Sequence, residues 1–149
     1  MSADLLEGGY LLDTNVLSEL MREAPAPEVL HWFAAQTSNR LYTCTINQAE
    51  TLAGIAVLPA GKRRDALARA AQQIFEDGFA GRCLAFGSGS AEQFALVIAQ
   101  RKRMGRPIEA VDAQVAAVAL AAHLKLVTRN AKDFAGIDSL EVINPWQPH

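Results

Sequence analysis

Five short apolar runs, separated by longer helix-forming segments, constrain the fold of this chain most. The runs are Tyr10–Leu12, Leu41–Thr45, Arg82–Phe86, Leu124–Thr128 and Leu140–Ile143. Runs this short and continuously apolar are typical of strands buried on both faces of a parallel sheet. Between them, apolar residues recur on one helix face, as in Leu67, Ala70, Ala71 and Ile74. The alternation predicts an α/β fold, a three-layer α/β/α sandwich with a central, mostly parallel sheet of about five strands.

The size and composition of the chain fit one compact domain. It has 149 residues, of which 50% are hydrophobic and 20% are charged, so it can bury a core and is not typical of a disordered protein. We therefore expect residues 1–149 to form a single domain. The formal net charge of −2 argues against a protein that coats nucleic acid, but it leaves room for a local basic surface.

Cysteine content and hydropathy limit the cellular setting. Cys44 and Cys83 each lie in a short apolar run without a second cysteine nearby, so we expect two buried, reduced thiols and no structural zinc. No apolar stretch approaches the roughly 18 residues that would span a bilayer. The first nine residues contain no Lys or Arg, unlike a secretory signal peptide. The sequence therefore predicts a cytoplasmic protein without a membrane partner.

Two capping patterns predict where helices begin. Thr45 is followed by Gln48, and Ser90 is followed by Gln93. This spacing is typical of a capping box, in which two side chains satisfy the free backbone N–H groups of the first helical turn. We therefore expect one helix to begin after each of these two residues.

Several carboxylates fall where predicted strands end or helices begin. Asp13 directly follows the first strand, Glu50 lies early in the helix after the second, and Asp112 lies near the start of the apolar helix Ile108–His123. Ligand sites of parallel α/β sheets gather at the carboxyl ends of the strands, so these side chains are expected to meet. Clustered carboxylates stay ionised together when they share a hard cation such as Mg²⁺ or Mn²⁺. The pattern predicts a divalent-metal site.

Each acid also fits a simpler interpretation. Asp near a helix start commonly caps the helix, and Glu50 fits an exposed helical acid. Glu109 precedes Asp112 by three residues on the same helix face, where it is either a solvated neighbour or a further ligand. The coincidence of three acids at one edge of the sheet favours a metal site over three unrelated residues.

Four segments, in order, resemble the motifs of PIN-domain ribonucleases, especially the VapC toxins of bacterial VapBC toxin–antitoxin pairs. They are Leu11–Glu19, Thr45–Glu50, Ile108–Ala117 and Leu126–Asn130. The closing Asn144-Pro145-Trp146 is similar to the end of the FitB-like branch of that family. The resemblance covers nearly the whole chain and implies the PIN fold, an α/β/α sandwich with a central parallel sheet.

The resemblance also implies roles for individual residues. The metal-binding acids of the family match Asp13, Glu50 and Asp112. The polar residues that support them match Thr14, Asn15 and Thr128. The fourth acid of the family falls at Asn130, which offers an oxygen but no charge, and Asp133 is either its substitute or an ordinary loop acid. We therefore expect one firmly held metal ion, with any second ion recruited together with substrate.

The reaction implied by the resemblance is hydrolysis of an RNA phosphodiester that leaves 5′-phosphate and 3′-hydroxyl ends. A bound Mg²⁺ or Mn²⁺ lowers the pKa of a coordinated water and neutralises charge on the phosphate. Glu50 fits direct metal binding, binding through water, or orientation of the attacking water. The family further implies a homodimer whose activity is neutralised by a cognate antitoxin protein.

Two basic clusters and one arginine are candidates for contacts with RNA phosphates. The clusters are Lys62-Arg63-Arg64 with Arg69, and Arg101-Lys102-Arg103 with Arg106. The second cluster also fits an ordinary solvated helix end. Arg129 lies beside the predicted site and is the stronger candidate. A set of apolar residues forms either a groove for the antitoxin or ordinary core: Leu17, Leu20, Met21, Trp32 and Phe33.

Two other functions fit parts of the sequence. A catalytically weak or silent PIN domain could act as an RNA- or protein-binding module, and Asn130 in place of the fourth acid favours this alternative. A phosphatase or receiver-like domain usually has Asp-x-Asp after its first strand, whereas Asp13 is followed by Thr14 and Asn15. We therefore predict a metal-dependent ribonuclease toxin, with the silent module as the alternative.

Overall fold

A five-stranded sheet forms the centre of the molecule, and every neighbouring pair of strands is parallel. The structure is a computed structural model that describes residues 8–147; part of the N-terminal segment considered above, Met1–Glu7, lies outside the described residues. The strands are β1 (Tyr10–Leu12), β2 (Leu41–Cys44), β3 (Cys83–Leu84), β4 (Lys125–Val127) and β5 (Val142–Ile143). Their order across the sheet is β3-β2-β1-β4-β5, which confirms the predicted parallel sheet of five strands.

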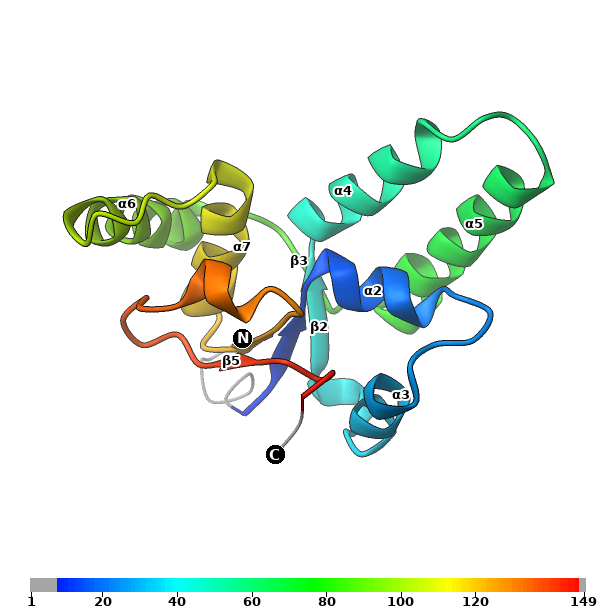
Figure 1. The fold of residues 1–149 in the computed structure, drawn as a ribbon, viewed down its shortest axis with the longest axis horizontal. Helices are drawn as coiled ribbons and strands as arrows, with labels where there is room; N and C mark the ends of the chain where they lie inside the picture. The colour runs from blue at the N-terminus through cyan, green and yellow to red at the C-terminus, as the bar shows by residue number, and fades with distance from the viewer. Residues whose placement is uncertain (1–7, 148–149) are drawn as a thin grey trace.

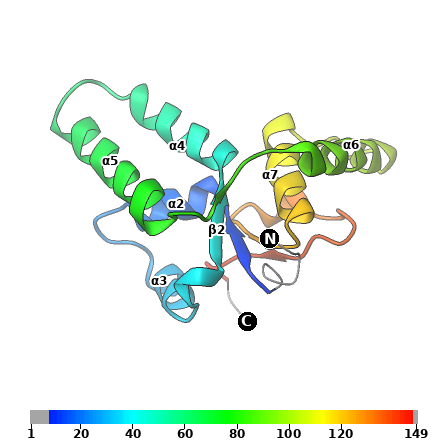
Figure 2. The ribbon, with the colours of Figure 1, turned by 180° about the vertical axis from the view of Figure 1, so that it is seen from behind.

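Helices lie on both sides of this sheet and complete the three predicted layers (Figure 1, and from behind in Figure 2). They are α2 (Thr14–Leu20), α3 (Pro27–Ala34), α4 (Thr45–Ala56), α5 (Lys62–Gln73), α6 (Ser88–Arg103) and α7 (Ala110–Ala121). A π-helical turn at Ile74–Gly78 continues α5, and single 3-10 turns lie at Ser38–Arg40 and Ala131–Phe134. In both views α6 packs beside α7, and α4 and α5 form an antiparallel pair on the other side of the central strands.

The strand residues alternate between two core clusters, as the two-residue period of a strand requires. Leu11 and Leu126 pack with residues of α6 and α7, whereas Leu12 and Val127 pack with residues of α2 and α5. All four side chains are fully buried. Both faces of the sheet are therefore largely apolar, and the buried hydroxyl of Thr43 in β2 is satisfied by the backbone carbonyl of Leu12.

Two helices begin almost directly at the carboxyl ends of strands. α4 begins at Thr45, immediately after β2, and α2 begins at Thr14, with one residue between it and β1. The predicted capping boxes are therefore wrong, because Thr45 is itself helical, Ser90 lies in the first turn of α6, and neither helix has a side-chain cap. These tight turns carry the polar residues of α2 and α4 over the carboxyl edge of the sheet.

Both cysteines are free thiols, as predicted. Cys44 is buried at the end of β2, whereas Cys83 in neighbouring β3 is half-buried. Within residues 8–147, no helix is both long enough and apolar enough to cross a membrane.

Candidate active site

Asp13 is the buried centre of a polar cluster at the carboxyl edge of the sheet. It directly follows β1, and its backbone N–H donates to the carbonyl of Val127 in β4 at 2.9 Å. Its side chain caps the start of α2, and only 6% of the residue is exposed. A carboxylate this deeply buried is tolerated only where hydrogen bonds satisfy its oxygens.

Four neighbouring groups donate hydrogen bonds to the Asp13 carboxylate. Oδ1 accepts the backbone N–H of Thr14 and the amide of Asn47, both at 2.9 Å. Oδ2 accepts the hydroxyl of Thr128 at 2.8 Å and a longer contact of 3.5 Å from the Asn15 amide. Burial raises the pKa of Asp13, and the hydrogen bonds oppose that rise by stabilising the ionised form. Three separate elements therefore hold one carboxylate in place.

Hydrogen bonds of Thr128 and Asn15 connect the end of β4 to the start of α2. The Thr128 hydroxyl accepts the Asn15 amide and the backbone N–H of Asn130, both at 3.1 Å, while it donates to Asp13. Asn15 Oδ1 in turn accepts the backbone N–H of Arg129 at 3.0 Å. The structure thus brings the predicted supporting residues together, and Asn130 contributes its backbone N–H to this network.

Asn47 is a site residue that the sequence did not single out. It is fully buried in the first turn of α4, where its amide donates both to Asp13 Oδ1 and, at 3.1 Å, to Thr14 Oγ1. Thr14 Oγ1 then donates to Glu50 Oε1 at 2.7 Å. Asn47 lies three residues before Glu50, on the same helix face and just after a predicted strand, and this spacing was the available signal.

Asp112 lies in the first turn of α7 and is half-buried. Burial raises the pKa of Asp112 to about 6, together with repulsion from Asp13, Asp133, Glu50 and Glu109. The shift means that these acids lie within electrostatic range of one another. A bound cation would relieve their repulsion.

The two additional acids considered from the sequence differ in their influence on the site. Asp133 is exposed, yet its charge raises the pKa of both Asp13 and Asp112. Glu109 stands just before α7, is also exposed, and has the smallest effect on Asp112. Asp133 is therefore the better candidate for a further acidic member of the site.

The oxygen atoms of the cluster that could bind a metal fit a hard divalent cation, because Mg²⁺ and Mn²⁺ prefer carboxylate, amide and hydroxyl oxygens. Asp13 Oδ2 has one short and one long hydrogen bond, so it has room for a further partner. The acids are nevertheless spread apart: within residues 8–147, no group of three or more His, Cys, Asp or Glu side chains could hold a metal ion by itself. The arrangement suits a cation that keeps several water ligands, as Mg²⁺ does.

The cationic residues near the site fall into two kinds. Arg129 is exposed, and its guanidinium carbon lies 4.9 Å from the centre of the Trp146 ring. Arg101 is instead only 4% exposed and donates at 2.7 Å to the backbone carbonyls of Arg106 and Asp133. The interpretation of Arg101 as a phosphate contact is therefore wrong, because its buried guanidinium is bound to the protein's own backbone.

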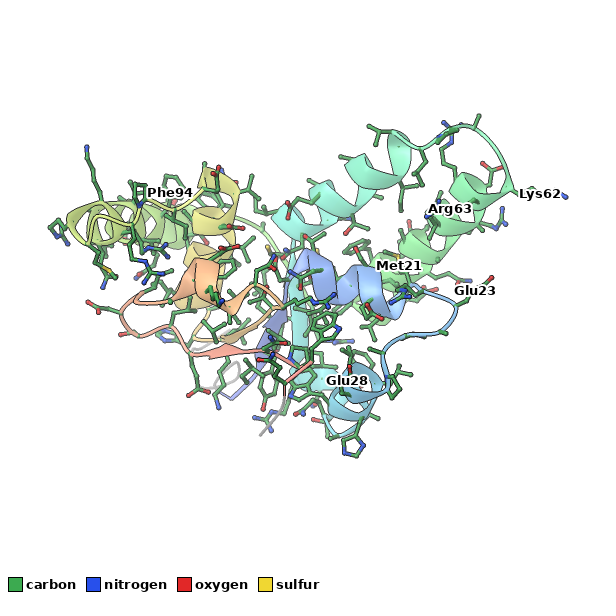
Figure 3. The ribbon with its side chains drawn as sticks, in the orientation of Figure 1. Met21, Glu23, Glu28, Lys62, Arg63 and Phe94 are labelled. Atoms are coloured by element: carbon green, nitrogen blue, oxygen red, sulfur yellow. The ribbon has the colours of Figure 1, made fainter. Side chains whose placement is uncertain are left out.

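A groove with a volume of about 1110 Å³ opens beside Thr14 and Glu50, between α2, α4 and α5. Its lining includes the apolar residues Met21, Ile55 and Leu67 and the cations Lys62 and Arg63. Figure 3 labels Met21 at the end of α2, and Lys62 and Arg63 at the start of α5. An apolar surface therefore adjoins the acidic cluster.

Of the two interpretations of the apolar residues of α2 and α3, ordinary core is correct for most of them. Leu17 belongs to the core, and Trp32 packs edge-on against Tyr10 with ring centres 5.1 Å apart. Leu20 and Phe33 also pack against the core. Of the five predicted residues, Met21 lines the observed groove, while α4 and α5 supply most of its apolar surface.

Comparison with known proteins identifies the family. A family model for the PIN domain matches residues 10–140. The chain belongs to the PIN-domain family. This PIN domain is 41% identical to plasmid stability protein StbB of Pseudomonas syringae pv. tomato, over 92% of this chain and 98% of that protein. It is 38% identical to VapC ribonuclease Y4jK of Sinorhizobium fredii, over 93% and 98% of the two chains. It is 35% identical to toxin FitB of Neisseria gonorrhoeae, over 91% and 97%.

Solved structures resemble the PIN domain over nearly its whole length. A structure of FitAB bound to a DNA fragment matches with a TM-score of 0.87 and 34% identity, covering 94% of this chain and 97% of that chain. FitAcB from Neisseria gonorrhoeae matches with a TM-score of 0.83 and 33% identity, covering 93% and 99%. These matches confirm the α/β/α fold and the resemblance to VapC and FitB proteins.

Proposed function

We propose that this PIN domain, which we take to span residues 1–149, is a divalent-metal-dependent ribonuclease and the toxin of a toxin–antitoxin pair. The observation that carries the proposal is the buried Asp13 carboxylate, held by hydrogen bonds within electrostatic range of Glu50 and Asp112. Relatives named VapC ribonuclease and toxin FitB support the same activity.

The residues of the cluster divide the work as follows. Asp13 and Asp112 would hold the cation, and Glu50 would hold it either directly or through water. When bound, Mg²⁺ or Mn²⁺ lowers the pKa of a coordinated water and neutralises charge on the scissile phosphate. Asn130, in place of a fourth acid, favours one firmly held ion. Arg129, held over Trp146, is free to contact a phosphate of the RNA.

An antitoxin protein is the partner that fits this assignment. Toxin FitB is a relative, and the FitAB and FitAcB complexes share the fold of this chain. The groove between α2, α4 and α5 joins an apolar lining to Thr14 and Glu50, so a partner bound there would also cover these two residues of the cluster. We expect a homodimer that acts on RNA in the cytoplasm.

The direct test measures cleavage of 5′-labelled single-stranded RNA by the purified protein in Mn²⁺, in Mg²⁺ and in EDTA. We expect cleavage with either metal and none in EDTA. Asp13→Asn removes the charge of the central ligand and should abolish cleavage while the far-UV circular dichroism spectrum is kept. Glu92→Gln is the matched control, because Glu92 is an exposed acid on α6 away from the cluster.

The proposal fails if the wild-type protein does not cut RNA in either metal, or if Asp13→Asn cuts at the wild-type rate. Cleavage that survives in EDTA would remove the metal from the mechanism. Products with 5′-phosphate and 3′-hydroxyl ends are expected, and mass spectrometry of the cleaved RNA identifies them.

A binding module without catalytic activity is the second candidate. It is favoured by the spread arrangement of the acids in the described part of the chain, where no three side chains could hold an ion alone. The same RNA decides between the two functions. Retarded migration of uncut RNA in Mn²⁺ supports the binding module, whereas shortened RNA supports the ribonuclease.

A further inference from the structure

The side-chain amide of Asn47 hydrogen-bonds to both Asp13 and Thr14, so it reaches Asp13 directly and Glu50 through the Thr14 hydroxyl. Its nitrogen donates one hydrogen to Asp13 Oδ1 and the other to Thr14 Oγ1. Because Thr14 Oγ1 accepts from Asn47, its own hydrogen is left to donate to Glu50 Oε1 at 2.7 Å. The orientation of one amide therefore determines the direction of the hydrogen bonds that reach two of the proposed metal-binding acids.

The opposite orientation of this amide would disrupt the cluster. It would turn the carbonyl oxygen of Asn47 toward the Asp13 carboxylate. Two hydrogen-bond acceptors would then lie next to each other, buried and with no hydrogen between them. It would also draw the hydroxyl hydrogen of Thr14 toward Asn47 and away from Glu50. Since the Asn47 side chain is fully buried, water offers no simple compensation for such a turn.

Cys44 supplies the contact that distinguishes the two ends of the amide. Its Sγ lies 3.0 Å from Asn47 Oδ1, and Cys44 and Asn47 are both fully buried. A thiol is a donor toward an oxygen, and the carbonyl oxygen of Asn47 has no hydrogen to donate in return. The thiol therefore favours the orientation in which the amide nitrogen faces Asp13.

We propose that Cys44 and Asn47 are positioning residues of the active site: the Cys44 thiol donates to Asn47 and fixes its amide so that it holds Asp13 and aims Thr14 at Glu50. The proposal rests on the proposed function for its catalytic consequence. Neither residue touches the substrate, and both act through the carboxylates.

Burial also keeps this thiol in its donating form. It raises the pKa of Cys44 to about 11, so the group remains a protonated thiol throughout the physiological range. Cys83, on the neighbouring strand, provides a comparison within the same chain. Its Sγ lies 3.7 Å from Gln48 Oε1 and has no hydrogen bond to Asn47. One cysteine therefore reaches the cluster, and the other does not.

The test compares Cys44→Ala, which removes the donor, with Cys44→Ser, which keeps a donor at the same position. Cys83→Ala is the matched control. Mn²⁺ affinity is measured by electron paramagnetic resonance of the free ion, and RNA cleavage is measured at saturating Mn²⁺. We expect Cys44→Ala to lower metal affinity or cleavage by about 10-fold, the effect typical of removing a group that orients a ligand. Cys44→Ser should recover most of the loss, and Cys83→Ala should resemble the wild type.

A second measurement needs no metal and no activity. In ¹⁵N-labelled protein, the side-chain NH₂ protons of Asn47 should exchange slowly with solvent in the wild type and in Cys44→Ser. They should lose protection in Cys44→Ala, because the Asn47 amide can turn in that variant.

Asn47→Leu, which removes both donors while keeping the volume, should lower metal affinity at least as much as Cys44→Ala.

The inference is overturned if Cys44→Ala keeps wild-type amide protection and metal affinity, or if Cys44→Ser is as impaired as Cys44→Ala. The second result would mean that the site needs the shape of the cysteine and not its hydrogen. Failure of the proposed function looks different: a wild-type protein that cuts no RNA refutes the ribonuclease, while the protection of the Asn47 amide still decides the role of Cys44.

Discussion

Replacing Asp112 with Asn should make the metal-free protein more stable at neutral and alkaline pH. The pKa of Asp112 is raised to about 6 by burial and by the neighbouring carboxylates, against about 3.9 for an unperturbed Asp. The folded state therefore holds this proton more tightly than the unfolded state. It follows that this group favours folding most below about pH 4 and that its contribution is lost as the pH rises through about 6.

The size of the effect follows from the shift. Two pKa units correspond to roughly 3 kcal/mol, but Asp112 is only half-buried, so solvent screening reduces the figure to about 1.5 kcal/mol. For a domain of this length, that corresponds to a rise in Tm of roughly 3–6 °C. Because Asn carries no charge at any pH, Asp112→Asn should avoid the loss that the wild type suffers above about pH 6.

The assay is thermal unfolding followed by circular dichroism at pH 4.5 and pH 8, in EDTA and in Mn²⁺. In EDTA we expect Asp112→Asn to unfold at a higher temperature than the wild type at pH 8, with a smaller difference at pH 4.5. In Mn²⁺ the order of the Tm values should reverse, because binding of the metal ion stabilises only the protein that retains the Asp112 carboxylate. Equal Tm values at pH 8 in EDTA would refute the electrostatic reasoning, and equal stabilisation by Mn²⁺ would refute Asp112 as a ligand.

Three further outcomes are expected. Arg101→Ala should destabilise the fold by about 2–4 kcal/mol in urea unfolding, because a buried side chain is lost and two backbone carbonyls lose a charged donor, whereas the exposed Arg103→Ala should change little. Arg129→Ala should raise KM for RNA more than it lowers kcat and should reduce the salt dependence of RNA binding by about one unit of slope. Leu67→Glu should abolish capture of the toxin by its antitoxin while RNA cleavage continues, and Leu96→Glu, on the exposed side of α6, should leave both unchanged.

The sequence predicted the layers well, and it placed Asp13 correctly at the end of a strand, because both depend on strong local patterns. Short apolar runs separated by helical segments leave few alternatives to a parallel sheet, and Asp13 follows the first run directly. Asn15 and Thr128 were expected to support Asp13, and the structure joins them to it at the ends of β1 and β4. Such residues are predictable because sheet topology brings strand ends together.

Two of the three errors concern interactions with partners distant in sequence, and the third concerns where a helix begins. Asn47 carries no charge, and although its spacing to Glu50 was a signal, its hydrogen bond to Asp13 becomes visible only once β1 and β2 are known to be neighbours. Arg101 lies in a basic run that is typical of a solvated helix end, yet it bonds to carbonyls in two later loops. Thr45 fits a capping pattern, but the helix begins one residue earlier than that pattern requires because the strand ends directly before it.

The hydrogen bond between Thr128 and Asp13 joins residues 115 positions apart, and it has a consequence for how the protein is made. β1 cannot acquire its β4 neighbour, nor Asp13 its Thr128 donor, until residues 125–128 have left the ribosome. A nascent or prematurely terminated chain that ends before β4 lacks one wall of the cluster and has an unsupported carboxylate. Synthesis of this protein therefore exposes the translating cell to a complete nuclease centre only after β4 and Thr128 have been made.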